Sequence, residues 1–259
     1  MPEIAVVTGA GSGLGRAIAR RLGAAGFAVV ATDIDHAAAR ETAESIPGSR
    51  SAEHDVRDAE QHRRIAREAA ERGRVRVWVN NAGVLALGPA WTHTDAEIER
   101  CVETNVLGTM HGSRAAVEVM RDQPAGGSIL NIASFAAFGA VPHLAVYAGS
   151  KHAVLGFTKS LNADLRNADS RIRATVACLD GTDTPMVRRH AGDPNAGVLW
   201  HRGRLLDPDD VAHRLVNALR SRRQVVCVPT ARGLAAQLLG LAPALSLRLI
   251  NAAARRHRA

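Results

Sequence analysis

The sequence predicts a single doubly wound α/β domain, in which a seven-stranded parallel sheet carries helices on both faces. Short apolar runs alternate along the chain with longer helical patterns, and right-handed crossovers between alternating strands and helices produce such a sheet. Composition agrees, because 46% of the 259 residues are hydrophobic but only 3% are aromatic. A core of Ala, Val, Leu and Ile suits close packing of helices on a sheet.

Seven strands are expected where apolar runs end at glycine, proline or polar residues. They cover residues 4–8, 27–33, 51–54, 75–80, 128–133, 172–178 and 224–229, the third being the weakest. Helical patterns fill the intervals. The helices cover residues 13–25, 37–45, 58–72, 95–120, 147–166 and 208–220, and a long loop precedes the last of them.

Residues 231–259 form an apolar and basic tail after the alternating pattern ends. Gln237, Pro243 and Arg248 interrupt it, so it is too broken for a membrane-spanning helix of about 20 apolar residues. Three interpretations stay open: packing on its own domain or on another subunit, which we favour, contact with a membrane surface, and a disordered end.

The composition also bears on location and partners. No basic segment precedes an apolar run at the start, so we expect no secretory signal and a cytoplasmic location. Cys101, Cys178 and Cys227 lack metal-ligand spacing, and we expect reduced thiols and no metal. The net charge of +8 suggests that nucleic acid or anionic lipid could be binding partners. No nucleic-acid motif accompanies the arginines, so we favour a solvated basic face.

A glycine-rich turn, TGAGSGLG at residues 8–15, joins the first strand to the first helix. Such a turn lets the backbone approach a pyrophosphate, whose charge then lies at the N-terminus of the helix. The spacing is G-x-x-x-G-x-G and departs from the general G-x-G-x-x-G fingerprint. Its place between a strand and a helix nevertheless predicts a dinucleotide site.

Asp33 ends the second strand. It follows the glycine-rich turn by about 20 residues, the sequence separation at which an acidic residue contacts the adenosine ribose in dinucleotide-binding folds. A carboxylate there accepts a hydrogen bond from the 2′-hydroxyl and repels a 2′-phosphate, and Ile34 follows it in place of a basic residue. This favours NAD over NADP. Arg16 follows the last glycine of the turn, where its positive charge could bind the 2′-phosphate of NADP. It is the residue that favours NADP.

Together with these residues, later motifs resemble the classical short-chain dehydrogenase/reductase family from Ile4 to about residue 229. The turn is similar to the family's cofactor turn, HDV at residues 54–56 to its adenine contact, and NNAG at 80–83 to the motif after its fourth strand. The resemblance implies a Rossmann-fold catalytic domain over residues 1–230. It assigns cofactor binding to Gly9, Ser12, Gly13, Leu14, Gly15, Asp33, Asp55, Val56, Asn81, Ala82, Gly83, Tyr147, Lys151, Thr182 and Thr184.

The active site that the resemblance implies comprises Asn105, Ser134, Tyr147 and Lys151, with the serine 13 residues before the tyrosine. Tyr147 would exchange a proton with the substrate oxygen, and Ser134 would donate a hydrogen bond to it. Lys151 would also bind the nicotinamide ribose, and Asn105 would hold a water that links Lys151 to solvent.

The spacing of Tyr147 and Lys151 places them on one face of a helix. A cation about 4 Å away contributes on the order of 4 kcal/mol at an effective dielectric constant near 20. This is enough to bring the pKa of a phenol from about 10 toward neutrality. The spacing therefore predicts that Lys151, helped by the positive charge of the nicotinamide, lowers the pKa of Tyr147.

One stretch departs from the family pattern after the sixth strand. Leu179 and Asp180 stand where the family has a Pro-Gly pair, and Asp180 brings a side chain and a charge where glycine supplies a permissive backbone. Gly181 is available to make the turn one residue later. Thr182 and Thr184 remain placed to meet the nicotinamide and the phosphates.

The resemblance and the residues together predict an NAD-linked alcohol dehydrogenase or ketone reductase. A large hydrophobic substrate is expected from the apolar residues of the loop at 185–206 and from those predicted opposite it: Leu85, Phe135, Phe138, Val141 and Leu144. The alternatives are an NADPH-dependent carbonyl reductase and, from another class, a sensor or adaptor that binds nicotinamide nucleotide without turnover. The family resemblance also implies a homodimer or homotetramer.

Overall fold

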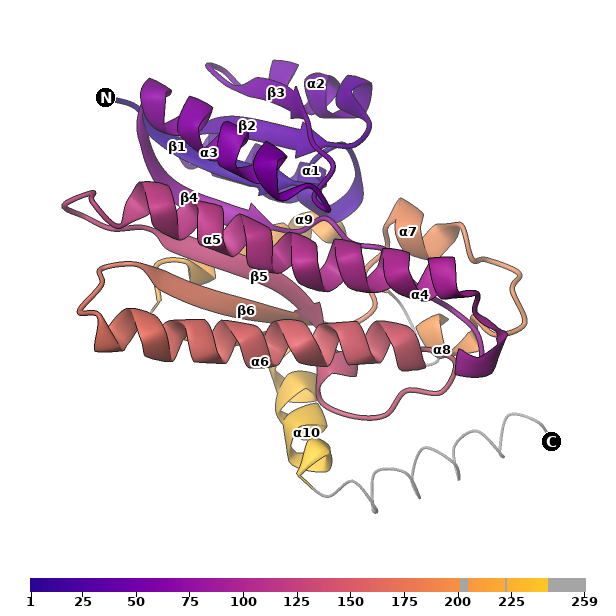
Figure 1. The fold of residues 1–259 in the computed structure, drawn as a ribbon. Coiled ribbons are helices and arrows are strands. Elements are labelled where there is room, and N and C mark those ends of the chain that lie inside the picture. Colours follow the sequence, from indigo (N-terminus) through magenta and orange to yellow (C-terminus); the bar gives the residue numbers. More distant parts are fainter. Residues whose placement is uncertain (201–204, 222, 242–259) are drawn as a thin grey trace.

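The computed structural model describes residues 1–200, 205–221 and 223–241. Within them, seven strands form one sheet in the order β3-β2-β1-β4-β5-β6-β7, and every neighbouring pair is parallel (Figure 1). The strands are β1 (Glu3–Thr8), β2 (Ala28–Asp33), β3 (Arg50–Glu53), β4 (Arg74–Asn80), β5 (Ser128–Ser134), β6 (Arg173–Leu179) and β7 (Val225–Val228). The predicted doubly wound Rossmann sheet is confirmed.

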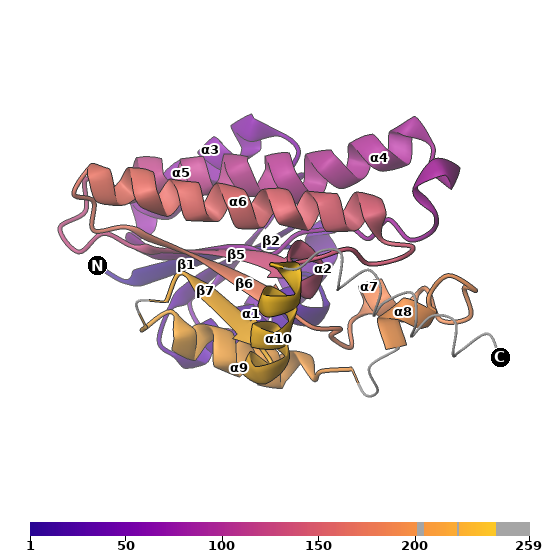
Figure 2. The same ribbon diagram turned by 90° about the horizontal axis from the view of Figure 1, so that it is seen from below.

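Helices cover both faces of this sheet. They are α1 (Gly13–Ala24), α2 (His36–Glu44), α3 (Ala59–Arg72), α4 (Asp95–Val102), α5 (Gly108–Met120), α6 (Ala145–Asn167), α7 (Pro185–Arg188), α8 (Gly197–Trp200), α9 (Pro208–Ala218) and α10 (Thr230–Gly240). In Figure 2, α3, α5 and α6 lie on one side of the sheet, and α1 and α9 lie on the other. None of the helices in the described segments is long and apolar enough to cross a bilayer.

Two buried apolar clusters hold these layers together. Leu22 of α1 and Leu215 of α9 pack with Val7 of β1 on one face. On the other face, Ile65 of α3 and Met120 of α5 pack with the opposite side of the sheet. Because every central strand is covered on both faces, its residues are apolar on both sides, as the unbroken runs in the sequence predicted.

The strand order reverses between β1 and β4, which pair directly with Val7 beside Val79. From β1 the chain winds outward to β3 in one direction and, after β4, to β7 in the other. The crevice at such a switch point, at the carboxyl ends of the strands, is where doubly wound proteins bind ligands. Both the glycine-rich turn and the residues after β4 lie there.

The described structure differs from the predicted elements in three places. The single helix expected over 95–120 is broken by a π-helix, η2 (Glu103–Leu107), between α4 and α5. The long loop after β6 contains the short helices α7 and α8. The predicted tail begins with α10, and the remainder of it, residues 242–259, lies outside the described residues.

Candidate active site

One large cavity opens at the carboxyl ends of the strands, with a volume of about 1720 Å³. Pockets for single drug-sized ligands measure about 300 to 1,000 Å³, so this one has room for a dinucleotide and a substrate together. Except for Asn105, the lining includes every residue of the predicted site. The structure thus brings together side chains from the first turn to the loop after β6.

The glycine-rich turn is built around close backbone contacts. Gly9 has φ +64°, in the left-handed region that favours glycine, and a Cβ there would lie 2.8 Å from the Cα of Ala82. A Cβ on Gly15 would overlap the carbonyl oxygen of Gly9. Asn81 fixes the turn from β4, because its Nδ2 donates to the carbonyl oxygens of Thr8 and Gly9 at 3.0 and 3.1 Å.

The N-terminus of α1 suits an anion. Ser12 is the N-cap residue but makes no side-chain capping hydrogen bond, and no acidic residue stands in the first turn. By contrast, aspartates cap α2, α3 and α9 through their carboxylates. Gly13 and Leu14 line the cavity at a helix N-terminus that has no side-chain cap, and such an N-terminus suits a pyrophosphate.

Asp33 lies at the edge of the same turn. Its Oδ2 accepts a hydrogen bond from the backbone N–H of Gly11 at 2.8 Å, and the residue lines the cavity. Arg16 is the residue that favoured binding of a 2′-phosphate. Its guanidinium instead pairs with Glu41 at 3.2 Å and donates to the carbonyl oxygen of Gly11. Asp33 lines the cavity, and Arg16 is not part of its lining.

Asp55 and Val56 line the cavity beside Asp33, as predicted for the adenine end. The sequence did not indicate that Arg57 engages Asp55, with Nη2 2.6 Å from Oδ2. Hydrogen bonds from Arg57 lower the pKa of Asp55, so the carboxylate stays ionised. Val56 also packs against Gly108 at the start of α5.

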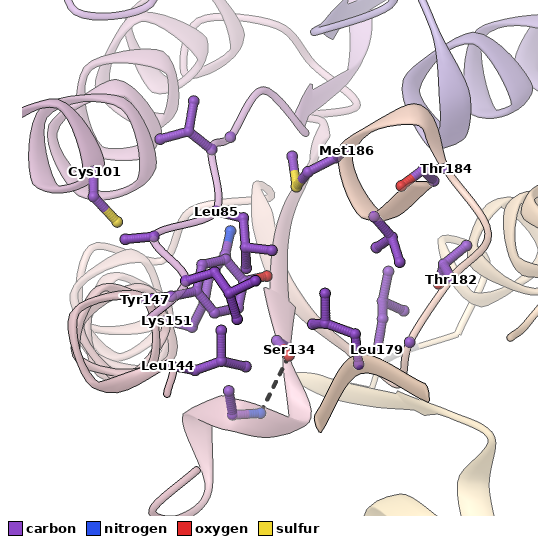
Figure 3. Close-up of a pocket in the computed structure, with 18 of the residues that line it drawn as sticks. Leu85, Cys101, Ser134, Leu144, Tyr147, Lys151, Leu179, Thr182, Thr184 and Met186 are labelled. Carbon is purple, nitrogen blue, oxygen red and sulfur yellow. Dashed lines mark hydrogen bonds between the residues drawn. The ribbon is translucent and has the colours of Figure 1, made fainter. Parts of the chain in front are cut away.

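Ser134, Tyr147 and Lys151 meet at the other end of the cavity. Figure 3 shows Tyr147 and Lys151 from α6 facing Ser134 at the end of β5, with Leu179, Thr182 and Thr184 across the cavity. The Nζ of Lys151 lies 5.6 Å from the centre of the Tyr147 ring and donates to the carbonyl oxygen of Ile132 at 3.0 Å. The Oγ of Ser134 accepts from the N–H of Ala136 at 3.2 Å, which leaves its hydroxyl proton for another acceptor.

Burial sets the acidities of this pair. It raises the pKa of Tyr147 to about 12, with Ser134 acting in the opposite direction, and it lowers the pKa of Lys151 to about 8. In the protein chain alone the predicted lowering of the Tyr147 pKa is not found, because burial dominates and Lys151 is not among the groups that shift this pKa. The combined effect of Lys151 and a bound nicotinamide stays a prediction.

Asn105 lies behind the cavity wall and not in it. Its side chain is fully buried in η2, where Oδ1 accepts from the N–H of Val84 at 2.8 Å and Nδ2 donates to the carbonyl oxygen of Val84 at 2.9 Å. Nδ2 also donates to Ser150 Oγ at 3.0 Å, and Ser150 donates to the carbonyl oxygen of Tyr147 at 2.7 Å. Asn105 therefore joins the loop after β4 to α6, and its role in holding a water stays a prediction.

The loop after β6 approaches the glycine-rich turn. Thr184 lies beside Gly13, where an added Cβ would be 3.1 Å from the Cβ of the threonine. Thr182 donates its hydroxyl to the carbonyl oxygen of Asp180 at 3.0 Å. Gly181 is not among the glycines with positive φ in the described segments, so the expected turn at Gly181 is not formed by a left-handed glycine.

Many apolar residues line the substrate end of the cavity, beside polar ones such as His143 and Asn195. The predicted lining residues are all present: Leu85, Phe135, Phe138, Val141, Leu144, Met186, Val187, Val198, Leu199 and Trp200. The sequence missed a further wall from α10, formed by Ala236, Leu239 and Gly240. The only signal for it was the apolar character of the tail.

Comparisons with known proteins agree with this architecture. The family model described as short chain dehydrogenase matches residues 3–195. The 3beta-hydroxysteroid dehydrogenase 1 of Eggerthella lenta is 35% identical over 217 residues, which cover 80% of this chain and 82% of that protein. Estradiol 17-beta-dehydrogenase 11 of Homo sapiens is 30% identical over 234 residues, which cover 88% of this chain and 75% of that protein.

Solved structures show the same likeness. A short chain dehydrogenase/reductase from Burkholderia phymatum, in complex with NAD, superposes with a TM-score of 0.83 at 28% sequence identity. The superposition covers 92% of each chain. Sequence and structure thus point to the same group of proteins.

Proposed function

Since the chain belongs to the short-chain dehydrogenase/reductase family of oxidoreductases, we propose that it interconverts a hydrophobic secondary alcohol and a ketone with NAD as cofactor. One observation carries the proposal. A single cavity joins the turn that bears Asp33 to Ser134, Tyr147 and Lys151. An oxidoreductase of this kind needs the nicotinamide beside the carbon that exchanges a hydride, and a proton donor or acceptor beside the oxygen bonded to that carbon.

The residues of the cavity fit a nicotinamide dinucleotide. The uncapped N-terminus of α1 would hold the pyrophosphate, and Asp33 the adenosine ribose. Lys151 would bind the second ribose, and Thr182 and Thr184 the nicotinamide end. When bound, the nicotinamide supplies or accepts the hydride. NAD is favoured because Arg16 is paired with Glu41 and the carboxylate of Asp33 would repel a 2′-phosphate.

The protein's own groups handle the proton. With a pKa of about 12, the Tyr147 phenol is protonated at neutral pH and can donate its proton to a carbonyl oxygen. Ser134 donates a hydrogen bond to the same oxygen and stabilises the negative charge that develops there. For alcohol oxidation the phenol must first lose its proton, and positive charge close to Tyr147 would favour that form. The ammonium of Lys151 is the protein's nearest source of such charge.

The apolar walls support a large hydrophobic substrate. Two of the relatives are named as dehydrogenases of hydroxysteroids, at 35% and 30% identity, and a hydroxysteroid or an alcohol of similar size suits a cavity of this volume. Arg189 and His190 also line the cavity. His201 and Arg202 of the same loop lie outside the described residues.

The experiment also tests two alternative functions. An NADPH-dependent carbonyl reductase would require Arg16 to leave Glu41 for the 2′-phosphate. A sensor or adaptor that binds the nucleotide without turnover was suggested by the departure at Leu179 and Asp180. The presence of Ser134, Tyr147 and Lys151 in one cavity favours catalysis over the sensor or adaptor. The choice between NAD and NADP is left to the cofactor titration.

The test is a titration with NADH and NADPH, followed by an absorbance screen of secondary alcohols and ketones that includes hydroxysteroids. We expect tighter binding of NADH, and turnover of at least one hydrophobic member. Tyr147→Phe should lower turnover by about a thousandfold, since general acid–base catalysis contributes about 10² to 10⁴, while NADH affinity stays within about twofold. Binding without turnover by the wild type would support the sensor, and full activity of Tyr147→Phe would refute the mechanism.

We also expect the protein to form a homo-oligomer. The family resemblance implies that α5 and α6 form the interface between subunits. Val102 and Leu107 are exposed apolar residues on and next to η2. Gly149 and Gly156 of α6 have open space where a Cβ would stand. A second copy would cover these positions. Sedimentation velocity should give a dimer or tetramer, and a monomer at micromolar concentration would contradict the expectation.

A further inference from the structure

The departure at the end of β6 is built into the structure. Leu179 is buried and lines the cavity. The N–H of Asp180 donates to the carbonyl oxygen of Val228 at 2.9 Å, and its Oδ1 accepts from the N–H of Gly181 at 2.9 Å. Asp180 is therefore held in one orientation at the edge of the cavity.

The second carboxylate oxygen of Asp180 has a charged partner from the far end of the chain. Arg232 of α10 donates from Nη1 to Oδ2 at 2.6 Å, although 52 residues separate the two. The side chain of Asp180 is 15% exposed and that of Arg232 is 41% exposed. A charge-assisted hydrogen bond of this length is among the stronger ones in proteins, and partial burial weakens its screening by salt.

Few other contacts hold α10 to the domain. Gly233 packs against Cys227 and Phe135. The Nε2 of Gln237 donates to the Sγ of Cys227 at 3.0 Å. Within the described segments, the contact with Asp180 is the one ion pair that α10 makes.

The outer face of α10 buries no apolar surface against the domain. Leu234, Leu238 and Leu241 are exposed there. A helix with one exposed face and few polar contacts opens more easily than the core of the sheet. Among the polar contacts that dock α10, the charge-assisted bond to Asp180 is stronger than the bond from Gln237 to a sulfur atom.

The inner face of α10 is part of the cavity. Ala236, Leu239 and Gly240 line it, and Gly240 lies against the backbone of Phe138. α10 follows β7 in the chain, and Figure 1 shows it projecting below α6. Movement of this helix would open the apolar wall that faces a large substrate and would leave the glycine-rich turn unchanged.

We propose that Asp180 and Arg232 are positioning residues, whose ion pair docks α10 and so completes the substrate-binding wall of the cavity. The inference deepens the proposed function and rests on it for its kinetic consequence. It also gives a reason for the aspartate that replaces the family's glycine: the carboxylate anchors a C-terminal helix that this chain uses to enclose its substrate.

The docking of α10 can be measured without any substrate. Cys101 and Cys178 are buried, and Cys227 is partly buried beneath Gly233 and Gln237. An aromatic disulfide reagent, with the modified cysteine identified by peptide mass, therefore reports the opening of α10 through Cys227. Arg232→Gln should raise the rate of Cys227 modification by about tenfold, since local opening follows the free energy lost. Asp180→Asn should do the same.

Two further variants control this measurement. Arg232→Lys keeps the positive charge but loses the planar fork, so its modification rate should lie between those of the wild type and Arg232→Gln. Arg64→Gln removes an arginine that pairs with Glu68 at 3.1 Å on α3, and its rate should equal that of the wild type. An Arg232→Gln rate equal to that of Arg64→Gln overturns the proposal.

The kinetic experiment compares a steroid alcohol with 2-butanol. In Arg232→Gln we expect the KM for the steroid alcohol to rise by about tenfold, and the KM for 2-butanol and the Kd for NADH to stay within about twofold. Equal losses for both alcohols would overturn the assignment of α10 to the substrate wall. If the wild type turns over no alcohol or ketone, the proposed function fails, and the Cys227 rates alone decide whether the ion pair docks α10.

Discussion

The ammonium of Lys151 lies 5.6 Å from the centre of the Tyr147 ring and donates to the backbone carbonyl of Ile132. The pKa of the phenol is raised to about 12 and that of the amine is lowered to about 8, in both cases chiefly by burial. Both shifts favour the neutral form of the group. The pair therefore lies in a poorly solvated site in which charged forms are unfavourable. In such a site a nearby cation or anion shifts the pKa of each group strongly, because the effective dielectric constant is low.

Lys151→Met should stabilise the protein at neutral pH while abolishing turnover. The folded pKa of Lys151, about 8, lies below its usual value of 10.5. Between these pKa values the unfolded chain binds more protons than the folded one, so the stability of the wild type rises with pH through this window. Below pH 8 the wild type is destabilised by the full free energy of burying a charged lysine. The advantage of Lys151→Met in free energy of unfolding should thus shrink by about 2 kcal/mol between pH 7 and pH 10, as measured by urea unfolding.

Lys159→Met is the matched control, because Lys159 is exposed on the same helix. Its free energy of unfolding should differ from that of the wild type by less than about 0.5 kcal/mol, because a surface substitution changes few contacts. Measurements should stop at pH 10, since the raised pKa of Tyr147 makes the folded state lose stability between about pH 10 and pH 12. A constant difference between Lys151→Met and the wild type would show that Lys151 keeps its charge.

Asn105→Ala should destabilise the fold by about 1 to 2 kcal/mol, because it leaves the partly buried N–H and carbonyl of Val84 without their side-chain partner. The loop after β4 also lines the cofactor site, so the Kd for NADH should rise with the loss of stability. Denaturant unfolding and NADH titration measure the two effects. The control Asn217→Ala removes an exposed amide from α9 and should change neither. An Asn105→Ala protein of unchanged stability that has lost turnover would favour the predicted water relay over this positioning role.

Glu41→Gln should improve NADPH binding and leave NADH binding unchanged. The pair of Arg16 and Glu41 is largely exposed on the glutamate side, and such pairs are worth about 0.2 to 1 kcal/mol. Release of the arginine should therefore lower the Kd for NADPH by about twofold to fivefold. Glu44→Gln is the control, since Glu44 faces Arg40 on the same helix α2. Unchanged NADPH affinity would mean that Arg16 does not reach the 2′-phosphate position.

The sheet and the residues of the cavity could be predicted because their signals are local. Unbroken apolar runs mark strands covered on both faces, and the turn from β1 to α1 needs glycine at Gly9 and Gly15 for contacts that any side chain would block. Ser134 and Tyr147 were found through their motifs. Their placement in one cavity follows from the parallel sheet, whose strands all end at the same edge.

The missed features depend on contacts between distant parts of the chain. The π-helix η2 interrupts a helical pattern that is continuous in the sequence, and Asn105 within it bonds to Val84 and Ser150, 21 and 45 residues away. The wall from α10 depends on an ion pair across 52 residues. The pKa of Tyr147 depends on how deeply the phenol is buried, which spacing along a helix does not give.

A pair of buried histidines outside the active site should make the protein sensitive to acid. His54 and His62 lie with their ring centres 4.2 Å apart. Burial lowers the pKa of His54 to about 3 and that of His62 to about 4, from a usual value of 6.5. Between pH 6.5 and pH 4 the unfolded chain binds protons that the folded chain does not, so stability falls as pH falls through this window.

His62→Gln should reduce this loss, because the amide can donate to the carbonyl oxygen of Val56 as the imidazole does at 2.9 Å, without titrating. We expect the wild type to lose about 2 kcal/mol more than His62→Gln between pH 6.5 and pH 4.5, as measured by urea unfolding at each pH. His213→Gln, at an exposed position of α9, should follow the wild-type profile. Parallel profiles for the wild type and His62→Gln would mean that His62 is protonated in the folded protein, and a charge would then be tolerated beside His54 in the core.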